Sequence, residues 1–250
     1  MNREATGLAG ARHLSFETLG STNAEALARA RAGESGPLWL TAKTQHAGRG
    51  RRGNVWVSPP GNLYATLLLT EPSPPAVAAQ LSFVAALALH DALTACAPQL
   101  SPSLTLKWPN DVLFGGAKLA GILIEGESAP AFAVAIGIGV NCASHPADTS
   151  FPATDLAAAG ARVTPEALFA SLAAAMTGRV DQWRGGEGFA VIRADWLKRA
   201  AGLGELLRVR LPERELSGRF RGLDEAGRLQ LDQPGGVIAV TAGEVFGLGA

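Results

Sequence analysis

Apolar positions fall into runs that glycine- and proline-rich breaks separate over the first 200 residues. Short runs rich in apolar and β-branched residues predict strands at 38–43, 62–70, 104–108, 118–127 and 131–140. Longer runs predict helices at 21–33, 76–96, 165–179 and 187–200. The most apolar strand, 131–140, is expected at the centre of a sheet. The 76–96 helix carries polar residues along its length, which favours a buried helix over a membrane span.

The first helix carries its own start and stop signals. Thr22 and Glu25 have the spacing of a capping box, and Gly33 suits the left-handed position that ends a helix.

The pattern changes after Gly202–Gly204. Short segments there alternate apolar with polar residues and are joined by Pro, Gly and Asp turns, which is typical of a small antiparallel barrel or sandwich. The chain is therefore predicted to be an α+β protein, with one domain over 1–202 and a small β domain over 203–250.

Composition excludes several classes of protein. Lys and Arg together number 22, as do Asp and Glu, so no overall charge points to nucleic acid or a membrane surface. The two cysteines, Cys96 and Cys142, form no CxxC pair, which argues against a disulfide framework or a zinc site. The first sixteen residues lack an apolar stretch of signal-peptide length. These features predict a cytoplasmic protein.

Positive charge is concentrated in one segment. Residues 35–70 hold no Asp or Glu, yet contain the glycine-rich loop Gly48-Arg49-Gly50-Arg51-Arg52-Gly53. Glycines let backbone N–H groups approach a phosphate, and arginines supply planar charged donors. The loop lacks the Gly-Lys-Ser/Thr of a Walker A motif. On its own it fits a phosphate site, an exposed flexible loop or a patch that binds RNA, and Trp56 fits base stacking or packing.

Two lysines mark the next motifs, although the chain has only four lysines against eighteen arginines. Lys107 precedes Trp108-Pro109-Asn110-Asp111, where Pro109 favours an extended residue before it and a turn after it. A plain turn explains the last three residues but not the lysine. Lys118 opens the 118–127 strand, where simple alternation places it on one face with Ala120 and Ile122. The alternative is an edge lysine that points to water.

Glycines inside the central strand form the last motif. Gly137 and Gly139 alternate, so both lie on one face and offer a flat floor to a planar ligand. The alternative is a helix packed tightly across the sheet. Asn141, at the strand end, fits a ligand contact or a cap for the next turn.

Together, GRGRRG, KWPND, KLAGIL and GIGVN, in this order, resemble the biotin–protein ligase family. The resemblance spans about residues 21–141 and implies a catalytic domain with a mixed or antiparallel sheet flanked by helices, as in biotin and lipoate ligases. The segment after it fits the family's small Src-homology-3-like barrel. Asn54 stands where the family often has a basic residue. The chain looks like the monofunctional form, which lacks a DNA-binding domain.

The resemblance also implies residue roles. Arg51, Lys107 and Lys118 would be the catalytic cations. Biotin would be bound by Ser21, Thr22, Asn23, Gln45, Gly48, Arg49, Arg51, Lys118, Gly121, Gly137 and Gly139. ATP and the adenylate would be bound by Arg49, Arg51, Arg52, Trp56, Lys107, Asn110, Lys118 and Asn141. Asp111 would assist Mg²⁺, held mainly by phosphates.

The implied reaction joins biotin and MgATP into biotinyl-5′-AMP and passes biotin to a lysine of a biotin carboxyl carrier protein. No tightly bound metal is expected. A homodimer is a further expected assembly, and neither DNA nor a membrane is an expected partner. Two rival functions remain: a lipoate or octanoate ligase or transferase of the same fold, and a nucleic-acid-binding module that uses the basic loop.

Overall fold

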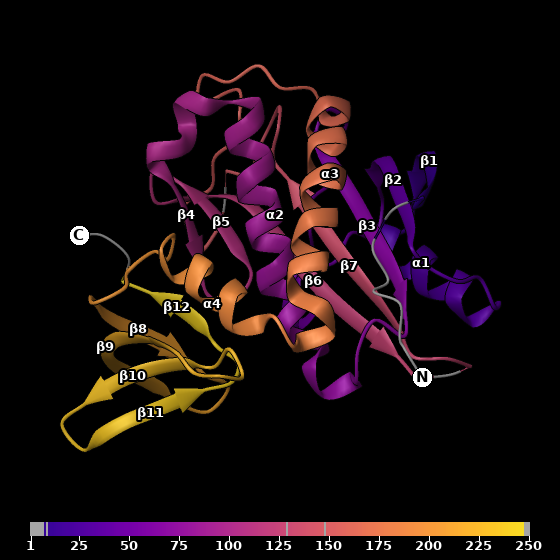
Figure 1. Cartoon of the computed structure of the whole chain (residues 1–250). Helices are drawn as coiled ribbons and strands as arrows, with labels where there is room; N and C mark the ends of the chain where they lie inside the picture. Colours follow the sequence, from indigo (N-terminus) through magenta and orange to yellow (C-terminus); the bar gives the residue numbers. More distant parts are fainter. Residues whose placement is uncertain (1–7, 9, 129, 148, 248–250) are drawn as a thin grey trace.

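The computed structural model describes residues 8, 10–128, 130–147 and 149–247 and contains two sheets (Figure 1). The larger sheet has seven strands in the order β1-β2-β3-β7-β6-β5-β4. Its strands are β1 (Arg12–Leu19), β2 (Leu38–Gln45), β3 (Leu63–Thr70), β4 (Leu104–Lys107), β5 (Asp111–Phe114), β6 (Ala117–Glu127) and β7 (Ala133–Val140). The pair β1–β2 is parallel and the other pairs are antiparallel, so the sheet is mixed, as predicted.

Helices cover both faces of this sheet (Figure 1). Its central strand is β7, which confirms the prediction for the most apolar run. Successive β3 residues face opposite sides: Leu67 belongs to the large core and Leu68 to a smaller one. The helix α1 (Thr22–Arg31) covers the smaller core. On the other face pack α2 (Leu81–Cys96), α3 (Pro165–Trp183) and α4 (Phe189–Leu197).

Two strands of this sheet were not predicted. The edge strand β1 leaves most of its side chains partly or fully exposed, so its sequence lacks an apolar run. The strand β5 has four residues and begins at Asp111, which was predicted to lie in a turn. Short 3₁₀ turns complete this part of the chain: η1 (Arg51–Gly53), η2 (Pro75–Gln80), η3 (Pro98–Ser103) and η4 (Arg184–Gly186).

The capping box predicted at Thr22 and Glu25 is wrong. Ser21 is the N-cap residue, and its hydroxyl accepts a hydrogen bond from Ala24 N at 3.4 Å. The Thr22 hydroxyl is engaged outside the helix, by Gln45 and Thr66, and so does not cap it. The stop signal is confirmed, since Gly33 has a φ of +88°.

The long apolar segment is a core element. Among the described residues, one helical stretch, Pro75–Cys96, is long and apolar enough to cross a membrane, and 78% of its most apolar window is buried inside the protein. This burial agrees with the prediction of a core helix.

The second sheet lies beside α4 and has five antiparallel strands in the order β11-β10-β9-β8-β12 (Figure 1). Its strands are β8 (Leu206–Arg210), β9 (Glu215–Leu223), β10 (Leu229–Gln233), β11 (Gly236–Val240) and β12 (Glu244–Phe246). The alternating pattern after residue 204 therefore predicted the right kind of unit. The domain boundary at 202/203 stays a prediction.

One buried hydrogen bond ties this second sheet to the first domain. Trp108 Nε1 donates to the carbonyl oxygen of Gly227 at 3.1 Å. Gly227 also packs against the Phe83 ring of α2, so closely that a Cβ there would come within 2.7 Å of that ring. Residues just after Lys107 thus anchor the second sheet.

We expect Trp108→Phe to lower the free energy of unfolding by about 1–3 kcal/mol, because it leaves the Gly227 carbonyl buried without a donor. Urea unfolding followed by circular dichroism measures the change. Unchanged stability would contradict a structural role for this bond.

Candidate functional site

A pocket of about 440 Å³ opens on the larger sheet. It collects residues from the start of α1, the glycine-rich loop, the ends of β4 to β7, the segment after β7 and the loop before β12. Every predicted site residue lines it except Gly48. A Cβ at Gly48 would lie 2.4 Å from the Trp56 carbonyl oxygen, so chain packing requires this glycine and its predicted contact with biotin is not supported.

The polar end of the pocket is a hydrogen-bonded chain of side chains. Gln45 Oε1 accepts from Thr22 N at 2.8 Å and lies 3.1 Å from Thr22 Oγ1. Thr22 Oγ1 lies 2.8 Å from Thr66 Oγ1, which lies 2.7 Å from Asn23 Oδ1. Thr66 is fully buried, whereas Thr22, Asn23 and Gln45 line the pocket.

This chain is rich in acceptors. Both amides are fixed in orientation, because Asn23 Nδ2 donates to Glu125 and Gln45 Nε2 donates to Ser58. Their oxygens therefore face the threonines, and each oxygen has a hydrogen-bond partner within the protein. An amide oxygen can accept two hydrogen bonds, so Asn23 Oδ1 has capacity for a further donor. This end of the pocket suits a ligand that brings an N–H or O–H group.

The glycine-rich loop forms a tight hairpin. Arg49 and Val55 make a β-bridge, and Gly50 N donates to Asn54 O at 2.7 Å. Arg52 and Gly53 at its tip have φ values of +56° and +78°, so both adopt the left-handed conformation. Glycine adopts this conformation without strain, which explains Gly53.

Three cations converge at the other end of the pocket. Lys118 Nζ lies 2.7 Å from Asp111 Oδ1, and Lys107 Nζ lies 4.0 Å from Asp111 Oδ2. Arg51 donates to Asn110 Oδ1 at 3.3 Å, and Asn110 in turn donates to Ile122 O at 2.7 Å. The predicted catalytic cations therefore share one site, which a polyanion would neutralise.

Burial lowers the pKa of two of these groups. Lys107 is 4% exposed, and this burial lowers the pKa of its ammonium. Lys118 lowers it further, whereas Asp111 and Glu244 raise it. Burial likewise lowers the pKa of Arg51, and Arg52 adds to that effect.

The predicted face of Lys118 is wrong. The pairing of β5 with β6 shifts register after Val112, so Leu119 is an extra residue between Lys118 and Ala120. This bulge breaks the alternation. Lys118 consequently shares the pocket face with Gly121, while Ala120 belongs to the core.

Side chains of the protein itself already cover the two glycines that were predicted to form a floor for a ligand. A Cβ at Gly137 would lie 2.3 Å from Asn23 Oδ1, so α1 packs tightly over it, as in the alternative reading of this motif. A Cβ at Gly139 would lie 2.5 Å from the Trp56 indole, which also lies over Gly121. Less of the sheet surface at these glycines is therefore open to a ligand than the pattern predicted. Trp56 packs beside Lys118, whose Nζ lies 5.5 Å from its ring centroid.

Asn141 and Asp111 have structural partners as well. Asn141 is buried and donates to Thr154 O at 3.0 Å, which fastens the segment after β7.

No group of three His, Cys, Asp or Glu side chains that could hold a metal occurs among the described residues. The carboxylate of Asp111 could supply a metal ion with one protein ligand at most.

Sequence reasoning did not identify several residues at this site, among them Thr66, Glu125, Phe151 and Glu244. Thr66 is a polar residue inside a largely apolar strand, and Glu125 ends the apolar run after Lys118, so both left a weak signal. Phe151, whose ring centroid lies 3.5 Å from Lys107 Nζ, and Glu244, which lines the pocket from the second sheet, left none.

The chain matches two models of protein families and is similar to several known proteins. Residues 18–141 match the biotin/lipoate A/B protein ligase family, and residues 202–247 match the biotin protein ligase C-terminal domain. A biotin–[acetyl-CoA-carboxylase] ligase of Paracoccus denitrificans is 47% identical over 90% of this chain and 96% of its own. One from Mycobacterium tuberculosis is 36% identical over 92% and 86%. The biotin protein ligase of Aquifex aeolicus, solved with biotin and ATP, superposes with a TM-score of 0.79 at 25% identity, over 94% and 97%.

We expect Gly137→Ala to destabilise the protein by about 1–3 kcal/mol, because its methyl group would collide with Asn23. Gly178→Ala in α3 is the control, since nothing lies within 4 Å of a Cβ there and helix propensity favours alanine by about 0.5–1 kcal/mol. Thermal unfolding compares the two. Equal stability of both variants would contradict the tight packing of α1 on β7.

Proposed function

The chain belongs to the biotin–protein ligases, and from that premise we propose that its pocket makes biotinyl-5′-AMP from biotin and ATP and transfers biotin to a carrier lysine. The observation that carries the proposal is the pocket itself. It has a polar end rich in hydrogen-bond acceptors and a cationic end formed by Arg51, Lys107 and Lys118.

The polar end favours biotin over lipoate. The ureido ring of biotin has two N–H donors, which suit the oxygen acceptors that line this end of the pocket. The dithiolane ring of lipoate has no N–H donor and cannot make such a contact.

The cationic end supports the first chemical step. A carboxylate oxygen of biotin attacks the α-phosphorus of ATP, the bond from that phosphorus to the bridging oxygen breaks, and pyrophosphate leaves. Both reactants are anions, so Arg51 and Lys118 offset their repulsion and the charge that grows on the phosphoryl oxygens. Lys107, held between Asp111 and Phe151, adds a third positive charge.

The second step needs no enzyme nucleophile. The amine of the carrier lysine attacks the acyl carbon of the mixed anhydride, and AMP leaves. Burial raises the pKa of Cys142 to about 12, so it stays a neutral thiol, and Cys96 does not line the pocket.

The names of the relatives support a carboxylase carrier domain as acceptor. Mg²⁺ would arrive on the ATP phosphates and screen their charge, with Asp111 and water as its other ligands. Homodimer formation and a cytoplasmic location stay predictions.

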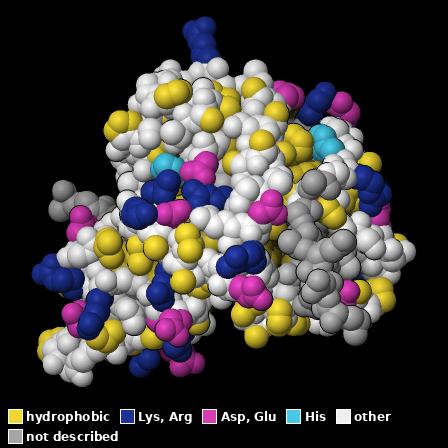
Figure 2. All heavy atoms as spheres, in the orientation of Figure 1, with side chains coloured by type: hydrophobic (Ala, Val, Ile, Leu, Met, Phe, Trp, Pro, Cys, Tyr) yellow, Lys and Arg dark blue, Asp and Glu magenta, His cyan; other side chains and the backbone are white. Residues whose placement is uncertain are grey.

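Surface charge weighs against the nucleic-acid-binding alternative. On the face drawn in Figure 2, Lys and Arg side chains lie interspersed with Asp and Glu side chains. A nucleic-acid-binding domain shows a continuous basic stripe instead. The arginines of the glycine-rich loop lie at the pocket, where Arg49 and Arg51 have partners within the protein.

Biotin-dependent exchange of pyrophosphate into ATP tests the proposal. We expect Arg51→Ala and Lys118→Ala each to slow exchange by about 10²–10³, the typical cost of losing one charge-stabilising donor. Lys198→Ala is the control, since this lysine is 71% exposed and pairs with Asp195 far from the pocket. Full activity in both pocket variants would refute the site assignment, and exchange with lipoate but not biotin would refute the substrate.

The pH profile tests the charge of Lys107. Burial lowers its pKa below the ordinary 10.5, so the ammonium is present below that lowered pKa and is lost as pH rises through it. We therefore expect exchange to decline at alkaline pH from a point below the ordinary lysine range. Lys107→Arg keeps its charge and should move the decline to higher pH. An unmoved midpoint would show that another group controls the profile.

A further inference from the structure

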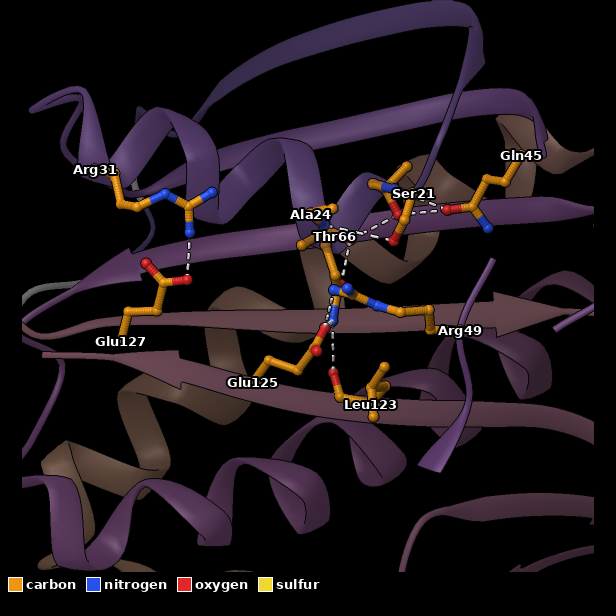
Figure 3. Close-up of polar contacts among 11 residues, drawn as sticks. Ser21, Ala24, Arg31, Gln45, Arg49, Thr66, Leu123, Glu125 and Glu127 are labelled. Atoms are coloured by element: carbon orange, nitrogen blue, oxygen red, sulfur yellow. Dashed lines mark hydrogen bonds and ion pairs between the residues drawn. The ribbon is translucent and has the colours of Figure 1, made fainter. Parts of the chain in front are cut away.

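Glu125 joins two parts of the pocket that lie far apart in the sequence (Figure 3). Its Oε2 atom accepts from Asn23 Nδ2 at 2.9 Å and from a terminal guanidinium nitrogen of Arg49, also at 2.9 Å. Asn23 belongs to α1, and Arg49 begins the hairpin of the glycine-rich loop. One carboxylate on β6 therefore ties the loop to the helix that carries the polar end.

The Asn23 side of this link is rigid. Asn23 is 3% exposed; its amide also donates to Leu123 O at 3.2 Å, and its oxygen faces Thr66. The absence of a Cβ at Gly137 gives it room. Glu125 thus has a fixed anchor on one side.

The Arg49 side is the movable one. Arg49 is 46% exposed, and within the described part of the chain its guanidinium has no other hydrogen-bond or ion-pair partner. Arg51 and Arg52 follow within the same hairpin. Release of Arg49 would leave the long bonds from Arg51 to Asn110 Oδ1 and Gly243 O, at 3.3 and 3.5 Å, as the side-chain hydrogen bonds of these arginines that hold the hairpin at the pocket.

Resting on the function proposed above, we propose that Glu125 is a positioning residue that holds the glycine-rich loop closed over the polar end of the pocket and thereby sets the affinity for biotin. Arg49, which lines the pocket, then acts in biotin binding through this ion pair. Glu125 itself does not line the pocket.

The neighbouring residue Glu127 provides a matched control. It lies two residues further along the same face of β6 and pairs with Arg31 of α1, so it too is a glutamate of β6 paired with an arginine (Figure 3). Its side chain is 31% exposed, against 29% for Glu125, and neither Glu127 nor Arg31 lines the pocket. Glu125→Ala and Glu127→Ala therefore remove similar ion pairs, only one of which holds the loop.

Limited trypsin digestion of the ligand-free protein tests loop closure without any need for activity. We expect Glu125→Ala to speed cleavage after Arg49, Arg51 and Arg52 by about tenfold, the factor that loss of about 1.4 kcal/mol produces, with the melting temperature and cleavage elsewhere unchanged. Glu127→Ala should be cut in the loop at the wild-type rate. Wild-type cleavage of Glu125→Ala, or faster cleavage along its whole chain, would overturn the proposal.

Kinetics provide the second readout. We expect Glu125→Ala to raise KM for biotin by about tenfold with a smaller change in kcat, because the loop still closes once biotin is bound. Glu125→Gln keeps an oxygen that can accept from Asn23 and Arg49 and should retain much of the affinity. A fall in kcat alone, or a KM for Glu125→Gln as high as that for Glu125→Ala, would count against loop positioning. Absence of biotin-dependent exchange in the wild type would instead refute the proposed function, while the digestion would still test the loop contact.

Discussion

Mutual repulsion among fixed cations is the constraint on which the site depends. Arg51, Lys107 and Lys118 come from a loop and two strands, and they are held together without an anionic ligand by Asp111 and Glu244. Two carboxylates do not balance three cations, and burial makes the excess more costly, as the lowered pKa of Lys107 indicates. The fold supplies the energy to hold this arrangement, and in the proposed reaction two anionic substrates would relieve the repulsion. Affinity for the substrates and their activation thus have one electrostatic origin.

The central strands explain how this charged end is joined to a neutral, polar one. Strands β6 and β7 run between the two ends, and glycines at 121, 137 and 139 let Asn23 and Trp56 lie directly on the sheet. The bulge at Leu119 turns Lys118 onto the same face. In the proposed function, the polar end would bind a ring that carries N–H donors, and the cations would bind the acid group at the other end of the same molecule.

The sequence predicted most features that depend on neighbouring residues and few that depend on contacts between distant segments. Apolar runs located the core strands and helices, since burial imposes a clear period on them. The edge strand β1 escaped because it leaves most of its side chains partly or fully exposed. The strand β5 escaped because its three apolar residues are too few to show a period. Nearly all residues that the motifs predicted line the pocket, but Gly48 does not, because it serves chain packing. The predicted face of Lys118 was wrong because it depends on a bulge. Phe151 and Glu244 reach the pocket only through tertiary folding, and Glu125 acquires its partners from segments about 75 and 100 residues away.

A crystal structure with biotin and a non-hydrolysable ATP analogue tests the central claim most directly. The account predicts the biotin ring beside Thr22 and Gln45, with its carboxylate and the α-phosphate both within hydrogen-bond distance of Arg51 and Lys118. Two ligands bound at separate places, with no shared contact to these cations, would contradict it.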